Sequence, residues 1–317
     1  MTKRILITGA SGYLGQHLVH SLLNNNNNED KKGWELYCLY NSSLGFAEKV
    51  KEASSSGAVV AGVDSLDLSN ASAVQEYLSN RPKMDVCLHL AAMASPRVCQ
   101  EDPVRAKAIN IPVALLDALA DTPTVALSTD QVYDGSNAPY NENCNAKPIN
   151  VYAQTKLGME QYVLKKKNAV CLRSSIILGP LAPYGGAHST FLHFCQSRKE
   201  QSTTFYTDEC RSVISVRDVV RILEWFCLNS SSSDDDARVY NMGGPHRVSR
   251  YDMARAVAEH CGFDHEPHFV QALKAQQPPG NVPSPPDISM TSTKLQELVG
   301  FEFRNLQAIL QDTFPAK

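Results

Sequence analysis

Residues 4–15 read Arg4-Ile5-Leu6-Ile7-Thr8-Gly9-Ala10-Ser11-Gly12-Tyr13-Leu14-Gly15, an apolar run that ends in a turn with three glycines. The run 5–8 predicts a β-strand, and 13–23 carries leucines at helical spacing. We expect Gly9 to permit a tight turn, Gly12 to let a pyrophosphate approach the backbone, and Gly15 to let helix and strand pack closely. The helix N-terminus adds free N–H groups and partial positive charge. The turn therefore predicts a dinucleotide site with cofactor contacts from Gly9, Ser11, Gly12, Tyr13, Leu14 and Gly15.

Apolar strands alternate with helical stretches along the first half of the chain. Strands are expected at 5–8, 34–40, 58–63, 86–90, 124–128 and 169–178, and helices at 13–23, 72–78, 103–120 and 151–165. This alternation predicts an α/β fold with a doubly wound parallel sheet covered on both faces. Later short strands are expected at 213–216 and 239–242, and helices at 217–227, 251–260 and 293–299. We expect a dinucleotide-binding Rossmann domain from 1–179 with a return segment 213–242, and a substrate lobe from 180–212 and 243–317.

Composition excludes several classes of function. The 317 residues are 43% hydrophobic and carry a net charge of −3, so we expect a large core, no basic face for nucleic acid and no membrane partner. The first strand begins almost at once, which leaves no room for a signal peptide. Nine dispersed cysteines without a CxxC pair indicate reduced thiols and a cytoplasmic protein. The cluster His260, Cys261, His265 and His268 fits no common zinc spacing, so we expect no metal. The polar stretches 24–28 and 230–236 are expected to be loops.

A second motif lies far downstream, where Tyr152 and Lys156 stand four residues apart. One helical turn places both on one face, where the ammonium can lower the phenol pKa from about 10. Such a pair can deliver a proton during carbonyl reduction. Tyr162 and Lys166 repeat the spacing, but they point to a different face of the same helix. We choose the first pair for its place at the helix start and its relation to Thr129, a strand-end hydroxyl that can donate to a substrate oxygen.

The ends of the second and third strands bear on the choice of dinucleotide. Asp67 and Leu68 follow the third strand, where a carboxylate can reach the adenine end. The second strand ends in Tyr40-Asn41-Ser42-Ser43, and no acid stands there to bind a ribose 2′-hydroxyl, which argues against strict NAD preference. No arginine stands there either, so the argument for NADP is incomplete. The sequence favours NADP(H) over NAD(H).

Taken together, these motifs resemble the extended short-chain dehydrogenase/reductase family. Within it they resemble the dTDP-4-dehydrorhamnose reductase branch, whose fold the regulatory β subunit of methionine adenosyltransferase shares. The resemblance covers nearly the whole chain. It is carried by the glycine turn at 8–15, Asp67-Leu68-Ser69-Asn70, His89-Leu90-Ala91-Ala92, Ser128-Thr129-Asp130 and the stretch 148–160.

The resemblance implies roles for individual residues. Thr129, Tyr152 and Lys156 would form the catalytic set, with Lys156 also holding the nicotinamide ribose. Ala91 and Ala92 would line the cofactor channel. The implied substrate-binding residues are Thr129, Asp130, Gln131, Ile176 and Arg211. Arg211 resembles the arginine that relatives place on the phosphates of a sugar nucleotide, although pairing with Asp208 or Glu209 is an equal alternative.

Departures from the family pattern lie on the substrate side. Gln131 replaces a usual tyrosine, Ile176 a frequent aromatic, and 284–287 a frequent Arg-Pro that would supply a second phosphate ligand. Two functions therefore remain open. The first is NAD(P)H-dependent reduction of a keto sugar nucleotide or related carbonyl, with a homodimer as one expected assembly. The second is a non-catalytic, NADP-binding regulatory subunit in complex with a methionine adenosyltransferase catalytic chain. An epimerase or dehydratase is less favoured, because no glutamate follows Thr129-Asp130.

Overall fold

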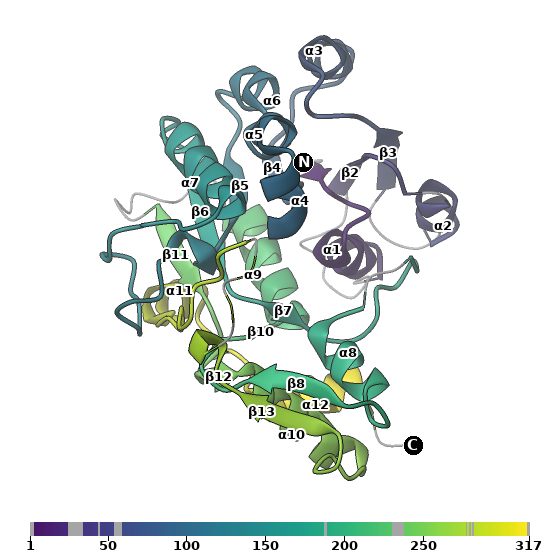
Figure 1. Ribbon diagram of the computed structural model, residues 1–317. Coiled ribbons are helices and arrows are strands. Elements are labelled where there is room, and N and C mark those ends of the chain that lie inside the picture. Colours follow the sequence, from purple (N-terminus) through teal and green to yellow (C-terminus); the bar gives the residue numbers. More distant parts are fainter. Residues whose placement is uncertain are drawn as a thin grey trace.

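The computed structural model describes residues 3–24, 34–43, 45–53, 59–186, 189–229, 238–276, 278, 280 and 282–315 (Figure 1). The expected loop 230–236, and all of 24–28 except Asn24, lie outside these residues. The main sheet is built from β1 (Lys3–Thr8), β2 (Trp34–Tyr40), β3 (Val59–Ser65), β4 (Val86–His89), β5 (Thr124–Thr129), β6 (Ala169–Ser174) and β11 (Val239–Met242). Their order is β11-β6-β5-β4-β1-β2-β3, and every pairing is parallel. The predicted doubly wound sheet is confirmed.

The strands bury both faces, as their near-continuous apolar runs require. On β1, Ile5 and Ile7 face one core and Leu6 faces another, following the two-residue period of a strand. The first face is covered by α1 (Tyr13–Asn24), α2 (Phe46–Ala53), α9 (Val216–Asn229) and α11 (Thr293–Val299). The opposite face is covered by α3 (Ala71–Ser79), α6 (Val113–Ala118) and α7 (Val151–Val163). The chain winds away from β1 in both directions, so its switch point lies between β1 and β4, where such sheets bind ligands.

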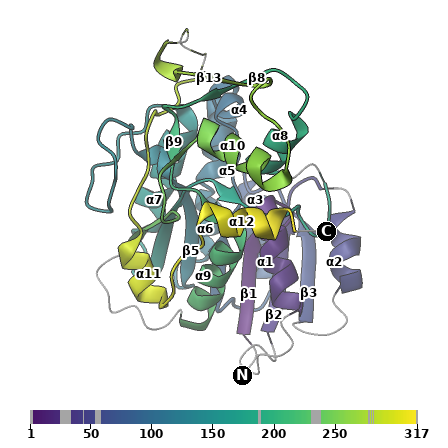
Figure 2. The same cartoon turned by 90° about the horizontal axis from the view of Figure 1, so that it is seen from below.

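A smaller lobe with its own core lies beyond the carboxyl ends of the strands, below the sheet in Figure 1 and in front of it in Figure 2. Its helices are α8 (Phe191–Ser197), α10 (Arg250–Cys261) and α12 (Leu306–Thr313). Its strands pair as β8 (Thr203–Tyr206) with β13 (Phe269–Ala272) and β9 (Cys210–Arg211) with β12 (Val248–Ser249). The domain division remains a prediction, and α11, expected in this lobe, contributes Leu295 and Val299 to the core of the sheet.

Two expected elements are divided in the structure. The helix expected at 103–120 is two helices, α5 (Pro103–Asn110) and α6, because Pro112 lacks the N–H that would continue the first helix. The strand expected at 169–178 ends at Ser174, and β7 (Ile177–Leu178) pairs instead with β10 (Ile214–Ser215). The sequence analysis also missed α2, α4 (Pro96–Glu101), α8 and α12.

None of the helices in the described ranges is long and apolar enough to cross a membrane. All nine cysteines are free thiols.

Candidate active site

The glycine turn joins β1 to α1 as the sequence predicts. Gly9 has a φ of +71°, and a Cβ on it would lie 2.7 Å from the Ala91 nitrogen. A Cβ on Gly15 would collide with the Gly9 carbonyl oxygen, so helix and turn pack as closely as expected. The Gly12 N–H donates to the Gly9 carbonyl oxygen at 3.0 Å and closes the turn. Among the described residues, this carbonyl oxygen is the one atom that a Cβ on Gly12 would approach closely. The turn thus leaves its outer surface open to a phosphate.

The other residues of the turn have mixed placements. Leu14 is buried in the core beneath the sheet, and Ser11 is half-buried. The Tyr13 hydroxyl donates to the Pro180 carbonyl oxygen at 2.9 Å, which ties α1 to the segment that follows β7. Their direct contacts with a cofactor stay a prediction.

A cavity of about 260 Å³ opens beside the turn at the ends of β2, β3 and β4. It is lined by Gly9, Leu39, Tyr40, Asn41, Leu66, Asp67, Leu68, Ala91, Ala92, Met93, Arg105 and Ile109. The structure therefore brings together the glycine turn and four predicted cofactor residues from two other strand ends. The Asp67 carboxylate accepts hydrogen bonds from the Ser69 N–H and hydroxyl at 2.9 and 2.7 Å, which lower its pKa. That this cavity takes the adenine end of a dinucleotide stays a prediction.

The predicted catalytic residues converge at the end of β5 and the start of α7. Asn150 caps α7, because its side chain accepts a hydrogen bond from the Ala153 N–H at 2.9 Å. This cap fixes the first turn of the helix and directs the Tyr152 phenol toward Thr129, whose hydroxyl hydrogen-bonds with it. Lys156 lies one turn further on and is 2% exposed.

Burial decides the protonation of both groups. It raises the pKa of Tyr152 to about 12, although the Thr129 hydrogen bond acts in the opposite direction. Burial also lowers the pKa of Lys156 to about 8, although the charges of Cys171 and Glu160 act to raise it. The expected direction of the phenol pKa is therefore wrong for this chain, because desolvation of the phenolate outweighs the effects that would lower the pKa. At neutral pH the pair consists of a protonated phenol and an ammonium.

The second pair with the same spacing lies elsewhere. The Tyr162 hydroxyl donates to Asp117 Oδ1 at 2.7 Å on the outside of α7. Lys166 donates to the Thr122 carbonyl and to Thr124 Oγ1 at 3.1 and 2.6 Å. These contacts engage the second pair elsewhere in the fold, whereas the prediction that the first pair meets the cofactor stays a prediction.

Asp130 follows Thr129 and lies buried at the same edge of the sheet. Thr129 Oγ1 donates to its Oδ1 at 3.3 Å. Its Oδ2 and the Ser175 hydroxyl are also buried, and the Ser175 hydroxyl is close enough to the carboxylate to lower the pKa of Asp130. Burial raises the pKa of Asp130, and the charge of Arg211 is the largest influence that opposes it. A role of Asp130 in binding substrate stays a prediction.

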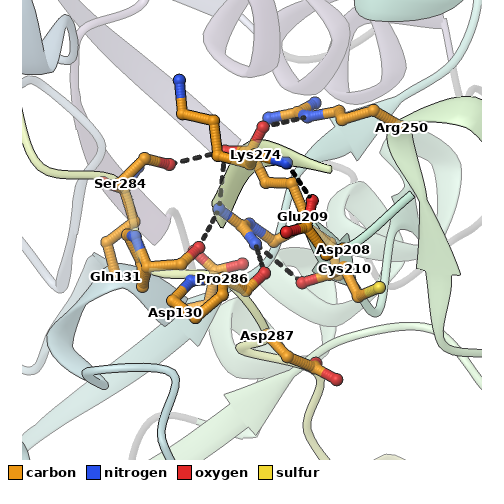
Figure 3. Close-up of polar contacts among 12 residues, drawn as sticks. Asp130, Gln131, Asp208, Glu209, Cys210, Arg250, Lys274, Ser284, Pro286 and Asp287 are labelled. Atoms are coloured by element: carbon orange, nitrogen blue, oxygen red, sulfur yellow. Dashed lines mark hydrogen bonds and ion pairs between the residues drawn. The ribbon is translucent and has the colours of Figure 1, made fainter. Parts of the chain in front are cut away.

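Arg211 is engaged by its own chain. Its guanidinium donates to the carbonyls of Pro286, Pro285 and Cys210 at 3.0, 3.0 and 2.7 Å. It also contacts Glu209 Oε1 at 3.3 Å, which is the pairing that the sequence left open. Figure 3 shows Glu209 bound to Ser284 on one side, at 2.5 Å, and to Arg250 on the other, at 3.6 Å. A phosphate could reach Arg211 only after segment 284–286 moved.

The two remaining substrate-side residues are tied into the fold. Gln131 Oε1 accepts a hydrogen bond from Asn150 Nδ2 at 3.0 Å. Asn150 Nδ2 also donates to the Pro283 carbonyl oxygen. Ile176 is half-buried and packs against the core of the smaller lobe. Their contacts with substrate stay a prediction. In the described ranges no group of three metal-ligating side chains is placed to hold a metal ion.

A protein-family model described as the RmlD substrate binding domain matches residues 3–316. The chain belongs to this family. It is similar to methionine adenosyltransferase 2 subunit beta of Danio rerio, with 24% identity over 302 residues, 94% of this chain and 85% of the relative. It is also similar to dTDP-4-dehydrorhamnose reductase of Mycolicibacterium smegmatis, with 25% identity over 325 residues, 100% of this chain and 86% of the relative. The fold matches a dTDP-4-dehydrorhamnose reductase from Bacillus anthracis in complex with NADP, with a TM-score of 0.77, 20% identity, and 99% and 98% of the two chains covered.

Sequence reasoning missed several residues that hold this RmlD-family site together. Asn110 accepts from the Met93 N–H at 2.7 Å and donates to Thr155 Oγ1 at 2.8 Å, so it ties α5 to α7 and to the loop after β4. Arg105 lines the cofactor cavity from α5. Nothing local in the sequence marks the contacts of Asn110, because they cross 17 and 45 residues of sequence.

Proposed function

We propose that this RmlD-family chain is an NADP(H)-preferring reductase of a keto sugar nucleotide or a related carbonyl compound. The observation that carries the proposal is the meeting of Tyr152 and Thr129 at the end of β5, one helical turn from Lys156 and at the same edge of the parallel sheet as the glycine turn and its cavity. The family assignment and the resemblance to reductases support the same reaction class.

In this reaction a bound reduced nicotinamide supplies a hydride to the carbonyl carbon. Tyr152 carries the proton that the carbonyl oxygen needs, because its raised pKa keeps the phenol protonated at neutral pH. Thr129 donates to the same oxygen and orients it. The ammonium of Lys156 stabilises the phenolate that remains after the proton has left. Asp130 and Ser175, which lie buried next to Thr129, would bind a substrate hydroxyl.

The test is oxidation of NADPH, followed by absorbance, with dTDP-4-dehydrorhamnose and a panel of smaller ketones and aldehydes. We expect turnover of at least one carbonyl by the wild-type protein, and its loss in Tyr152→Phe. Tight binding of NADPH without oxidation by any member of the panel would count against the proposal.

A second candidate is a regulatory subunit that binds NADP(H) without turnover. It is supported by the engagement of Arg211 with segment 284–286, which removes a phosphate ligand from the substrate side. It is also supported by similarity to the beta subunit of methionine adenosyltransferase 2 over 94% of the chain. Co-purification with a methionine adenosyltransferase catalytic chain, measured by light scattering, tests it. The same measurement on the protein alone separates a monomer from a homodimer.

A further inference from the structure

The cofactor cavity contains a cation that comes from an unexpected element. Arg105 lies in the first turn of α5, where its N–H donates to the Asp102 side chain at 3.0 Å. Ile109, four residues later, lines the same cavity, so one face of α5 presents both side chains to it. Asn41 lines the same cavity from the end of β2. Arg105 therefore shares a cavity with the strand end at which the sequence offers neither an acid nor an arginine.

The charges around this cavity favour an anionic ligand group. Among its lining residues the charged ones are Asp67 and Arg105. Asp67 is already satisfied in part by two hydrogen bonds from Ser69. The guanidinium of Arg105 makes no hydrogen bond or ion pair with any residue in the described ranges, so its N–H donors remain available for a ligand. Its charge nevertheless acts on the Asp67 carboxylate, which places the two side chains near each other.

We propose that Arg105 binds the 2′-phosphate of NADP(H) and sets the preference of this site for NADP(H) over NAD(H). A phosphate monoester carries about −1.5 to −2 charges at neutral pH and presents oxygens that match the planar fork of a guanidinium. NAD(H) has a hydroxyl at that position and gives the guanidinium no charged partner. The inference rests on the proposed dinucleotide site, but it does not depend on turnover at Tyr152.

The experiment measures dissociation constants of NADPH and NADH from nicotinamide fluorescence, and of 2′,5′-ADP and 5′-AMP by calorimetry. The variants are Arg105→Gln and Arg105→Lys. Lys107→Gln is the matched control, because it removes the same charge from an exposed position of the same helix outside the cavity. We expect Arg105→Gln to weaken NADPH and 2′,5′-ADP about tenfold, or about 1.4 kcal/mol. NADH and 5′-AMP should change less than about twofold, and Arg105→Lys should fall between. Raising salt from about 50 to 500 mM should reduce the preference of the wild-type protein.

Three results would overturn the inference. The first is that the wild-type protein binds NADH as tightly as NADPH, and the second is that Arg105→Gln leaves NADPH binding unchanged. The third is that Arg105→Gln weakens the binding of both dinucleotides equally, which would make Arg105 a contact of the adenine ring. Failure of the proposed function would give different results. If the dinucleotide site is wrong, NADPH, NADH, 2′,5′-ADP and 5′-AMP all fail to bind. If only the reductase activity is wrong, NADPH binds selectively and no carbonyl is reduced.

Discussion

Replacing Lys156 with methionine is expected to stabilise the folded protein while it abolishes carbonyl reduction. The side chain is 2% exposed, and burial lowers the pKa of its ammonium from 10.5 to about 8. At about 1.36 kcal/mol per pH unit, this difference corresponds to about 3 kcal/mol of destabilisation by the buried charge. Methionine has a similar length and no charge, so the variant should recover most of that free energy. Reduction should fall about 100-fold or more, because the phenolate loses its cation.

The pH dependence of the free energy of unfolding shows whether the buried charge of Lys156 causes the gain in stability. At pH 7 the amine is protonated in the folded and unfolded states, so the full cost is present. As pH rises from 8 to 10.5, the folded protein releases the proton first and the unfolded chain keeps it, so the stability of the wild-type protein increases. Urea unfolding at pH 7 and pH 10 should therefore show a gain of about 3 kcal/mol for the variant that shrinks to about 1 kcal/mol. Lys167→Met, at an exposed position just after α7, should stay within about 0.5 kcal/mol of wild type at both values. A variant that is no more stable at pH 7, or a gain that is independent of pH, would refute the reasoning.

Three further outcomes are expected. Tyr152→Phe should lower kcat about 10²- to 10⁴-fold with NADPH affinity unchanged. The control Tyr162→Phe should retain activity. Equal losses of kcat in both variants would show that disturbance of the helix, rather than loss of the Tyr152 phenol, is responsible. The rate of reduction should decline as pH rises through about 8, because Lys156 loses its charge there; a flat profile to pH 10 would contradict this. Glu160→Gln should lower the free energy of unfolding by about 3–5 kcal/mol, measured in urea, because Arg173 would keep a buried charge without its partner at 2.8 Å. A loss below about 1 kcal/mol would mean that the pair is not desolvated.

The sequence predicted the elements whose signal is local. The span of β2, 34–40, is the same in the prediction and in the structure, because six of its seven residues are apolar or β-favouring and five of them are buried. The roles of Gly9 and Gly15 in the turn followed from the absence of a Cβ, which is a property of each residue alone. The position of Tyr152 on α7 followed from helical spacing and from the Asn150 cap.

What the sequence could not show depends on distant contacts. The main-chain carbonyls of Pro285 and Pro286 bind Arg211 from 74 and 75 residues away, and a carbonyl has no sequence signature. Arg105 lines the same cavity as the end of β2 although two strands and three helices separate them in sequence, so an arginine sought near Asn41 in sequence was missed. The phenol pKa shifted opposite to the expectation, because spacing gives the nearby charge but not the depth of burial.

The seven-stranded sheet is completed late in synthesis. Its edge strand β11 comes from residues 239–242, whereas its neighbour β6 ends at Ser174. While the ribosome makes the roughly 65 residues between them, one side of β6 has no partner, although all six of its residues are buried in the finished protein. The unpaired backbone of such an edge is a template for association with other nascent chains. A ribosome that stalls within α9 would therefore release a fragment with an intact glycine turn and an unpaired edge at β6. Chaperone binding to the nascent chain should be strongest while the residues between β6 and β11 are translated.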